Sequence, residues 1–254
     1  MKIRVIALNT FKEAVRDRIL YLLLFFAAAA IILSRILALL TVGDRTKIIK
    51  DVGLASISFF GALMAILIGT GLVYKEIEKR TIFTLISKPI HRYEFLLGKF
   101  FGLILTLFIM LACMSVIFLA LVFFHTFKIE WALLAAIVFN FLELILITAV
   151  AIFFSSFSTP ILSSLFSLGF YLIGHFSWSL ETLIKKIRPG VARTLIQVLY
   201  TILPDLENFN IKTEVVHGLP LPASLFLYST AYGLIYAAFI LALAVFIFQR
   251  RDFI

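Results

Sequence analysis

Two polar side chains lie deep in an otherwise apolar stretch of the chain, where they could take part in chemistry inside a membrane. Asn140 and Glu143 are one helical turn apart near the middle of Trp131–Phe154, so a helix places both on one face. A carboxylate at the bilayer centre costs about 2.5–3.5 kcal/mol, so Glu143 should have a partner or be protonated. It is either a pathway or switch residue, or one half of a structural hydrogen bond between helices.

Small and polar side chains also recur every three or four residues in the next apolar stretch. They are Ser156, Pro160, Ser164, Ser167, Tyr171, His175 and Trp178. The spacing is that of a heptad seam, and this composition is typical of a helix interface rather than a lipid-facing surface. The stripe is expected to line a pathway, to form a seam between subunits, or to pack against another helix of the same chain.

The sequence contains no catalytic or metal-binding motif. Gly98-Lys99 lacks the preceding glycine of a phosphate-binding loop, and Phe100 stands where that loop has Ser or Thr. Metal-ligand spacing is missing among the four histidines, His91, His125, His175 and His217. G-x-S-x-G and H-E-x-x-H do not occur. We therefore predict no catalytic residue, no metal site and no cofactor bound by this chain.

The elements that position these residues follow from composition. The chain has 254 residues, of which 63% are hydrophobic and 15% charged, so much of its surface must face lipid. A spanning helix takes roughly 20 apolar residues, and hydrocarbon requires every backbone polar group to be bonded internally. We predict an all-α polytopic membrane protein with six transmembrane helices, at Ile19–Leu40, Val52–Tyr74, Phe100–Phe124, Trp131–Phe154, Pro160–Ser179 and Ala223–Phe248.

Basic residues predict how the chain is oriented. Six spans put both termini on one side, and more Lys and Arg fall on that side than on the other, which favours cytoplasmic N- and C-termini. The net charge of +9 is explained by loops held against an anionic leaflet, and we expect no nucleic-acid partner.

Two segments outside the spans have recognisable character. Residues 1–18 have an apolar and a charged face and predict an amphipathic helix in the membrane interface. Residues 180–222 are the longest gap between spans and are placed outside. Within them, 191–203 has helical spacing but is too short to span, which indicates an interfacial or re-entrant helix before the last span.

Residues 75–99 form the longest predicted cytoplasmic loop and the most densely charged part of the chain. Glu76 and Glu78 open the loop, and Pro89 ends its short apolar stretch because proline cannot continue a helix. Arg92 begins the next helix. A short, rigidly held segment suits docking to a partner because little order has to be gained on contact. An ordinary charged cytoplasmic loop is the alternative interpretation.

The loop also carries the pattern E-x-E-x-x-T-[IL]-x-x-L-x-S-x-P-[IV]-x-R-x-E-x-x-x-G-K. Its residues are Glu76, Glu78, Thr81, Ile82, Leu85, Ser87, Pro89, Ile90, Arg92, Glu94, Gly98 and Lys99. This resembles the loop between spans two and three of type-2 ABC transporter permeases. The predicted spans, the N-terminal helix, the LPDLENFNIK stretch at 203–212 and the ending Arg250-Arg251-Asp252-Phe253 are similar too. Arg80 departs from the pattern, since many members have Gly before the Thr.

The resemblance implies that residues 1–254 form a single permease domain of an ATP-driven transporter, most simply an exporter. Its partners would be a separate ABC ATPase subunit, which binds ATP and Mg, and a second permease copy or a related chain, all within membrane lipid. The loop would hold a coupling helix, with the ATPase contact at or near Glu76, Glu78, Thr81, Leu85, Ser87, Pro89 and Arg92. We expect the inner (cytoplasmic) membrane of a prokaryote.

A second function uses the intramembrane polar residues without any ATPase. In a secondary transporter or channel, Glu143 and His175, with Arg35, would form an ion or proton relay. Such transporters are often built from inverted repeats with interrupted helices, and the sequence shows neither. A membrane enzyme or scaffold of the same architecture is a third alternative. The sequence does not specify the transported substrate.

Overall fold

The computed structural model describes residues 2–41, 43–78, 91–177 and 190–250, together with 182, 184 and 186. Within these residues the regular elements are all helices and no strand occurs, which confirms the predicted all-α class. The elements are α1 (Lys2–Val15), α2 (Arg18–Leu39), α3 (Arg45–Glu78), α5 (Arg92–Thr126), α6 (Trp131–Ser155), α7 (Pro160–His175), α9 (Val191–Ile202), η1 (Leu206–Phe209), α10 (Lys212–His217) and α11 (Ala223–Arg250).

Five of these helices, α2, α3, α5, α6 and α11, are long and apolar enough to cross a membrane. This confirms a multi-pass membrane protein. The remaining apolar helix, α7, has 16 residues and is about 24 Å long, shorter than a hydrocarbon core of ~30 Å. Within the span expected at Pro160–Ser179, α7 ends at His175. Ser177 is the one further residue of that range that the structure describes as helical.

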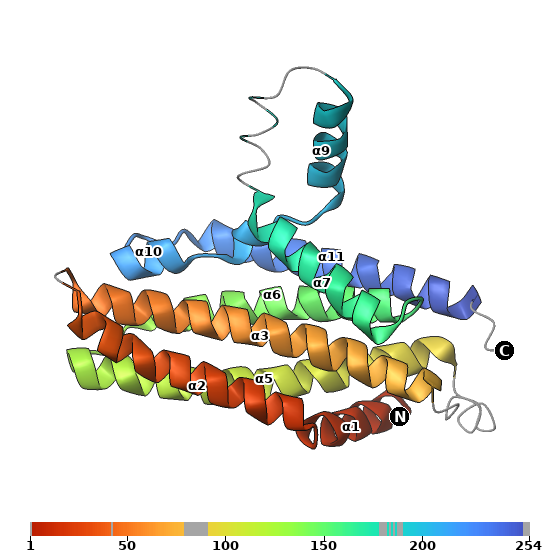
Figure 1. Cartoon of the computed structure of the whole chain (residues 1–254), viewed down its shortest axis with the longest axis horizontal. Helices are drawn as coiled ribbons and strands as arrows, with labels where there is room; N and C mark the ends of the chain where they lie inside the picture. Colours follow the sequence, from red (N-terminus) through yellow and green to blue (C-terminus); the bar gives the residue numbers. More distant parts are fainter. Residues whose placement is uncertain are drawn as a thin grey trace.

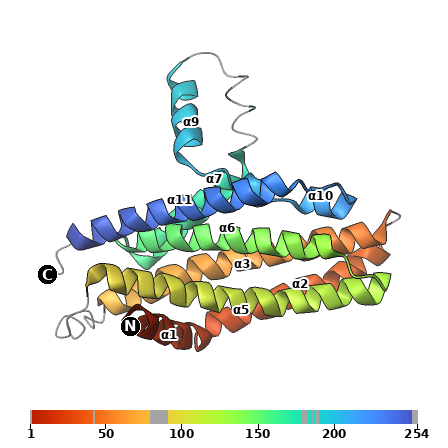
Figure 2. The ribbon, with the colours of Figure 1, turned by 180° about the vertical axis from the view of Figure 1, so that it is seen from behind.

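The long helices lie side by side along one axis, with α3 and α6 at the centre (Figures 1 and 2). Two glycines of α3 allow this close approach. A Cβ on Gly61 would lie 3.0 Å from a methyl group of Leu144, and one on Gly69 would lie 3.1 Å from the Cβ of Ala151. Small residues at such contacts let two helix backbones approach each other, which is how membrane helices gain packing energy.

One end of the bundle gathers several chain segments and is called the α1 end. It contains α1, the last turn of α3 at Glu78, the first turn of α5 at Arg92 and the last turn of α11 (Figure 1). The start of α5 is fixed by a capping box, in which the His91 backbone N–H donates to Glu94 Oε2 at 2.9 Å. A helix beginning at Arg92 agrees with the prediction.

The opposite end, called the α10 end, contains α10, the start of α3 and the start of α6 (Figure 1). Here α3 begins at Arg45, several residues before the predicted span, because Asp44 Oδ1 accepts the Thr46 backbone N–H at 3.1 Å. Lys50, which we expected in a loop, therefore lies on α3. Its Nζ pairs with Glu130 Oε2 at 2.6 Å, which ties α3 to the start of α6.

The N-terminal helix α1 packs closely on α5 rather than lying only against the interface. A Cβ on Gly102 of α5 would lie 2.5 Å from the carbonyl oxygen of Ala7, so only glycine fits there. A Cβ on Gly98 would meet Ile6 at 2.6 Å. Gly98 belongs to the loop pattern, so part of that pattern positions α1. The sequence did not predict this contact, since Gly98 lay in the predicted loop and Gly102 in the predicted span Phe100–Phe124.

After α7 the chain leaves the bundle and later returns to it. The helix α9 stands away from the other helices in both views (Figures 1 and 2). The returning segment, residues 203–217, then packs against the bundle through the buried side chains Leu206, Phe209 and Ile211. A Cβ on Gly174 of α7 would lie 2.6 Å from Leu206 Cγ, and one on Gly233 of α11 would lie 2.8 Å from Phe209 Cζ.

A glycine substitution tests this contact. We expect Gly174→Ala to push the returning segment away from α7, because its new Cβ has no room beside Leu206. The cost should be about 1–3 kcal/mol, as for other overpacked sites. Gly169→Ala on the same helix is the matched control, since nothing lies within 4 Å of its Cβ. Thermal unfolding in detergent should separate the two variants, and equal stability would contradict the contact.

Candidate functional site

The pair Glu143–His175 is the centre of the candidate site. His175 Nε2 and Glu143 Oε1 are 2.8 Å apart, and the Glu143 side chain is 2% exposed. Glu143 lies twelve residues into α6, at about 18 Å along a helix that begins at the α10 end. The predicted need for a partner is therefore met by His175 at the end of α7. Arg35 is exposed on α2, which packs against α3 and α5.

The returning segment supplies further charges at the same depth. Glu207 Oε2 lies 3.7 Å from His175 Nδ1, so the imidazole stands between two carboxylates. Lys212 is close enough to interact electrostatically with Glu143, Glu207 and Asp51. The five residues join α3, α6, α7, η1 and α10 into one charged network.

The backbone of the returning segment is held in place by its own hydrogen bonds. Asp205 accepts from the Ser177 hydroxyl and, at 3.1 Å, from the Glu207 backbone N–H, which starts η1. The Asp205 backbone N–H lies 3.0 Å from the Tyr232 hydroxyl of α11. Irregular backbone at membrane depth is tolerated only where protein surrounds it. We placed residues 180–222 outside; the structure brings 205–209 beside the middle of α6.

Asn140 and Tyr171 complete the polar region. Asn140 is 3% exposed, and its Nδ2 has no hydrogen-bond partner among the described residues. The Tyr171 ring meets the His175 ring edge to face with centroids 4.6 Å apart, and its hydroxyl is close enough to Ser58 of α3 to interact with it. A buried donor without a partner is uncommon and costs about 1–3 kcal/mol. This corner of the site therefore has unused hydrogen-bonding capacity.

The first half of the α7 stripe, which contains Ser164 and Ser167, also makes contacts within the same chain. Ser164 Oγ and Thr70 Oγ1 of α3 are 2.8 Å apart. The buried Ser167 hydroxyl donates to the Ser163 carbonyl at 2.7 Å. Together with Tyr171 and His175, these residues place the stripe against α3 and α6. These contacts are with other helices of the same chain, which is the third of the three expectations for the stripe.

No metal centre is formed in the part of the chain that the structure describes, because no three His, Cys, Asp or Glu side chains converge there suitably. The contacts within the network are a hydrogen bond and charge interactions. Sequence reasoning missed Glu207, Lys212 and Asp51. The Pro204-Asp205 pair inside LPDLENFNIK was the available signal, because proline and a capping acid in an apolar region indicate a built turn.

The predicted coupling residues lie at the α1 end or outside the described residues. Glu76 and Glu78 belong to the last turn of α3, while Thr81, Leu85, Ser87 and Pro89 fall in 79–90, which the structure does not describe. Arg92 has a role that we did not predict. Its Nη1 donates to the carbonyl oxygens of Phe248 at 3.0 Å and Gln249 at 2.8 Å.

A cation at the carboxyl end of a helix satisfies free carbonyl groups and the helix dipole. Arg92 therefore fastens the start of α5 to the end of α11. The stacked rings of Phe95 and Phe248, with centroids 6.0 Å apart, strengthen the same contact. On the other side of α5, the Lys99 side chain is 1% exposed, and its Nζ bonds to Glu13 Oε2 of α1 at 3.2 Å. The first turns of α5 are thus anchored on two sides.

Comparison with known proteins agrees with this architecture. The family described as ABC-2 family transporter protein matches residues 4–253, nearly the whole chain. No curated protein matches the chain. A family match of this extent, on an all-α bundle with five membrane-length helices, shows that the chain belongs to the ABC-2 family of membrane transporters.

Proposed function

We propose that this chain is the membrane-spanning subunit of an ATP-driven exporter, coupled to a separate ATPase subunit that holds ATP and Mg. The observation that carries the proposal is that α3 ends and α5 begins at the same end of the bundle, the α1 end, on either side of residues 79–90 in the chain. These residues connect the two longest helices, α3 with 34 residues and α5 with 35, at the α1 end. In a family of transporters, a segment that joins two long, anchored helices is well placed to transmit a force from a partner ATPase to both of them.

The anchoring of α5 explains how the force would be transmitted. Lys99 ties α5 to α1 through Glu13, and Arg92 ties it to the end of α11. Force applied between Glu78 and Arg92 would therefore move α1, α5 and α11 together. In this proposal Arg92 positions the segment, while Leu85, Ser87 and Pro89 lie at the ATPase contact.

Helix α3 links this end to the charged network. From Glu78 to Asp51 it is continuous over about 40 Å at 1.5 Å per residue. Asp51 and Ser58 interact with Lys212 and Tyr171 respectively. Movement of α3 would thus shift the partners of Glu143 and His175, so the network would act as a conformational switch beside the pathway.

The proposed topology follows the charge bias. The α1 end is cytoplasmic, with both termini there, in the inner membrane of a prokaryote. Six crossings are supported by α2, α3, α5, α6 and α11, with α7 and the returning segment together forming the fifth crossing. Residues 1–254 form one permease domain that works as a homodimer or with a related chain, and α1 rests in the interface with Val5 and Leu8 exposed.

The second candidate function, a transporter or channel without an ATPase, is favoured by one observation. Glu143, His175 and Glu207 form a short chain of exchangeable groups, with distances of 2.8 Å and 3.7 Å. A proton relay would use such a chain. It predicts transport driven by a pH gradient in the absence of ATP, which separates it from the first proposal.

Co-purification with the ATPase tests the coupling. We expect Leu85→Glu to lower the recovery of the ATPase about 30-fold or more, the effect of losing a hot spot of about 2 kcal/mol. Ile129→Glu, at an exposed position in the connection between α5 and α6 at the α10 end, is the matched apolar-to-Glu change and should leave recovery unchanged. If both variants keep the ATPase bound and its activity stimulated, the coupling assignment fails.

A further inference from the structure

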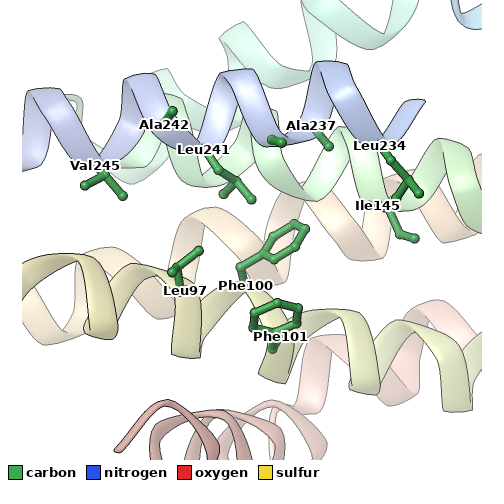
Figure 3. Close-up of a pocket in the computed structure, with 10 residues that line it drawn as sticks. Leu97, Phe100, Phe101, Ile145, Leu234, Ala237, Leu241, Ala242 and Val245 are labelled. Carbon is green, nitrogen blue, oxygen red and sulfur yellow. The ribbon is translucent and has the colours of Figure 1, made fainter. Parts of the chain in front are cut away.

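An apolar groove runs along the outside of the bundle between α5 and α11. It has a volume of about 570 Å³, and Figure 3 shows Leu97 and Phe100 of α5 opposite leucine, alanine and valine side chains of α11. The ten lining residues are Leu97, Phe100, Phe101, Ile145, Leu234, Ala237, Ala238, Leu241, Ala242 and Val245. The alanines leave the space that larger side chains would fill. No residue of the charged network lines this groove.

The length of the groove matches one leaflet of a bilayer. Its α11 wall runs from Leu234 to Val245, eleven residue steps, or about 16 Å at 1.5 Å per residue. The hydrocarbon core is ~30 Å thick, so each leaflet contributes about half of that. Val245 lies five residues before Arg250, the last residue of α11, at the α1 end. The groove therefore extends from the membrane surface at that end to roughly the bilayer centre.

A second hollow adjoins the groove at this surface. It has a volume of about 390 Å³ and is lined by Lys2, Ile3, Arg4, Ala7, Glu94 and Phe101. Phe101 lines both spaces, so the two are neighbours. Lys2 Nζ lies 3.7 Å from Glu94 Oε2, and these two charges balance. Arg4 is exposed and forms no ion pair within the described residues, so the hollow has an excess positive charge.

We propose that the groove and the hollow together bind one anionic phospholipid, with an acyl chain in the groove and the phosphate beside Arg4 and Lys2. Apolar walls one leaflet long, ending at a cation that has no ion pair among the described residues, match the two halves of such a molecule. A helix of a second subunit would match the apolar walls but not the cationic end. The proposal requires only that α5 and α11 cross the membrane, so it does not depend on the ATPase.

Native mass spectrometry of the full-length protein tests the groove. The probes are phosphatidylglycerol and phosphatidylcholine with identical acyl chains, titrated into protein in mild detergent. We expect Ala242→Trp to fill the groove and to weaken binding of both lipids about tenfold, since displacing two methylene groups already has that effect. Ala231→Trp is the matched control, because Ala231 is exposed on the same helix and does not line the groove.

A second variant tests the charged end. Arg4→Gln should reduce the preference for phosphatidylglycerol over phosphatidylcholine about fivefold, the effect of one cation near an anionic surface, and leave phosphatidylcholine binding unchanged. Lipid binding by Ala242→Trp equal to wild type would overturn the proposal. An equal loss in Ala231→Trp would do so as well. A loss of dimer mass in Ala242→Trp with lipid retained would assign the groove to a second subunit instead.

Discussion

Replacing Glu13 with alanine should lower the free energy of unfolding by about 3 kcal/mol, the lower end of the range for breaking a buried ion pair. The reason is that Lys99 stays behind, 1% exposed, without the carboxylate that now lies 3.2 Å from its ammonium group. Glu13 itself is 36% exposed, so its own desolvation adds little. Thermal unfolding in detergent measures the loss, and limited proteolysis should show earlier release of α1.

Two further variants make this test specific. Glu13→Ala combined with Lys99→Met removes both charges and keeps an apolar side chain of similar length. This double variant should be more stable than Glu13→Ala alone, because it removes the buried ammonium group together with the carboxylate that it pairs with in the wild type. Lys12→Ala changes an exposed neighbouring charge and should have almost no effect. If Glu13→Ala and Lys12→Ala unfold at the same temperature, the ion pair does not hold α1 on α5.

The second large effect is expected at Glu143. Glu143→Gln keeps the shape and hydrogen-bonding capacity of the side chain but removes the charge that His175 and Lys212 share. If the network switches with the ATPase, the coupling between ATP binding and the returning segment should fall about 5- to 150-fold, the usual range of coupling energies. The amount of protein in the membrane should stay near that of wild type.

The readout does not require the substrate to be known. The one cysteine, Cys113, is replaced with alanine, and Thr213→Cys places a thiol on the exposed side of α10. The ATP-dependent change in its maleimide labelling rate reports movement of the returning segment. Thr148→Val on α6 is the control, since that hydroxyl donates only to its own helix at the Leu144 carbonyl. An ATP response in Glu143→Gln as large as in wild type would rule out the switch.

The spans could be predicted because hydropathy is local. Each of the five membrane-length helices is found where an apolar stretch indicated one, with ends extended by caps such as Asp44 and Glu94. Residue chemistry also indicated that Glu143 would need a partner, and His175 supplies one. The sequence did not predict which polar side chains would contact one another, because these contacts depend on the packing of helices that are far apart in the chain.

The returning segment shows this limit most clearly. Its residues are irregular and mixed in polarity, so they read as an external loop. Their position beside α6 depends on Gly174 and Gly233, which open space for Leu206 and Phe209. A contact of this kind, between glycines of two helices and apolar residues of a loop, leaves no periodic pattern in the sequence. Arg92 is a similar case, because its partners are backbone carbonyls 156 and 157 positions away.

The charged network also has a consequence for biogenesis. Glu143 precedes its partner His175 by 32 residues, and Lys212 follows much later. Membrane proteins are synthesised from the N-terminus, so α6 leaves the ribosome before these partners are in place beside it. The carboxyl group must then enter the translocon in its protonated form, or wait at the lipid surface. Insertion of α6 should therefore be completed only when translation has passed Lys212.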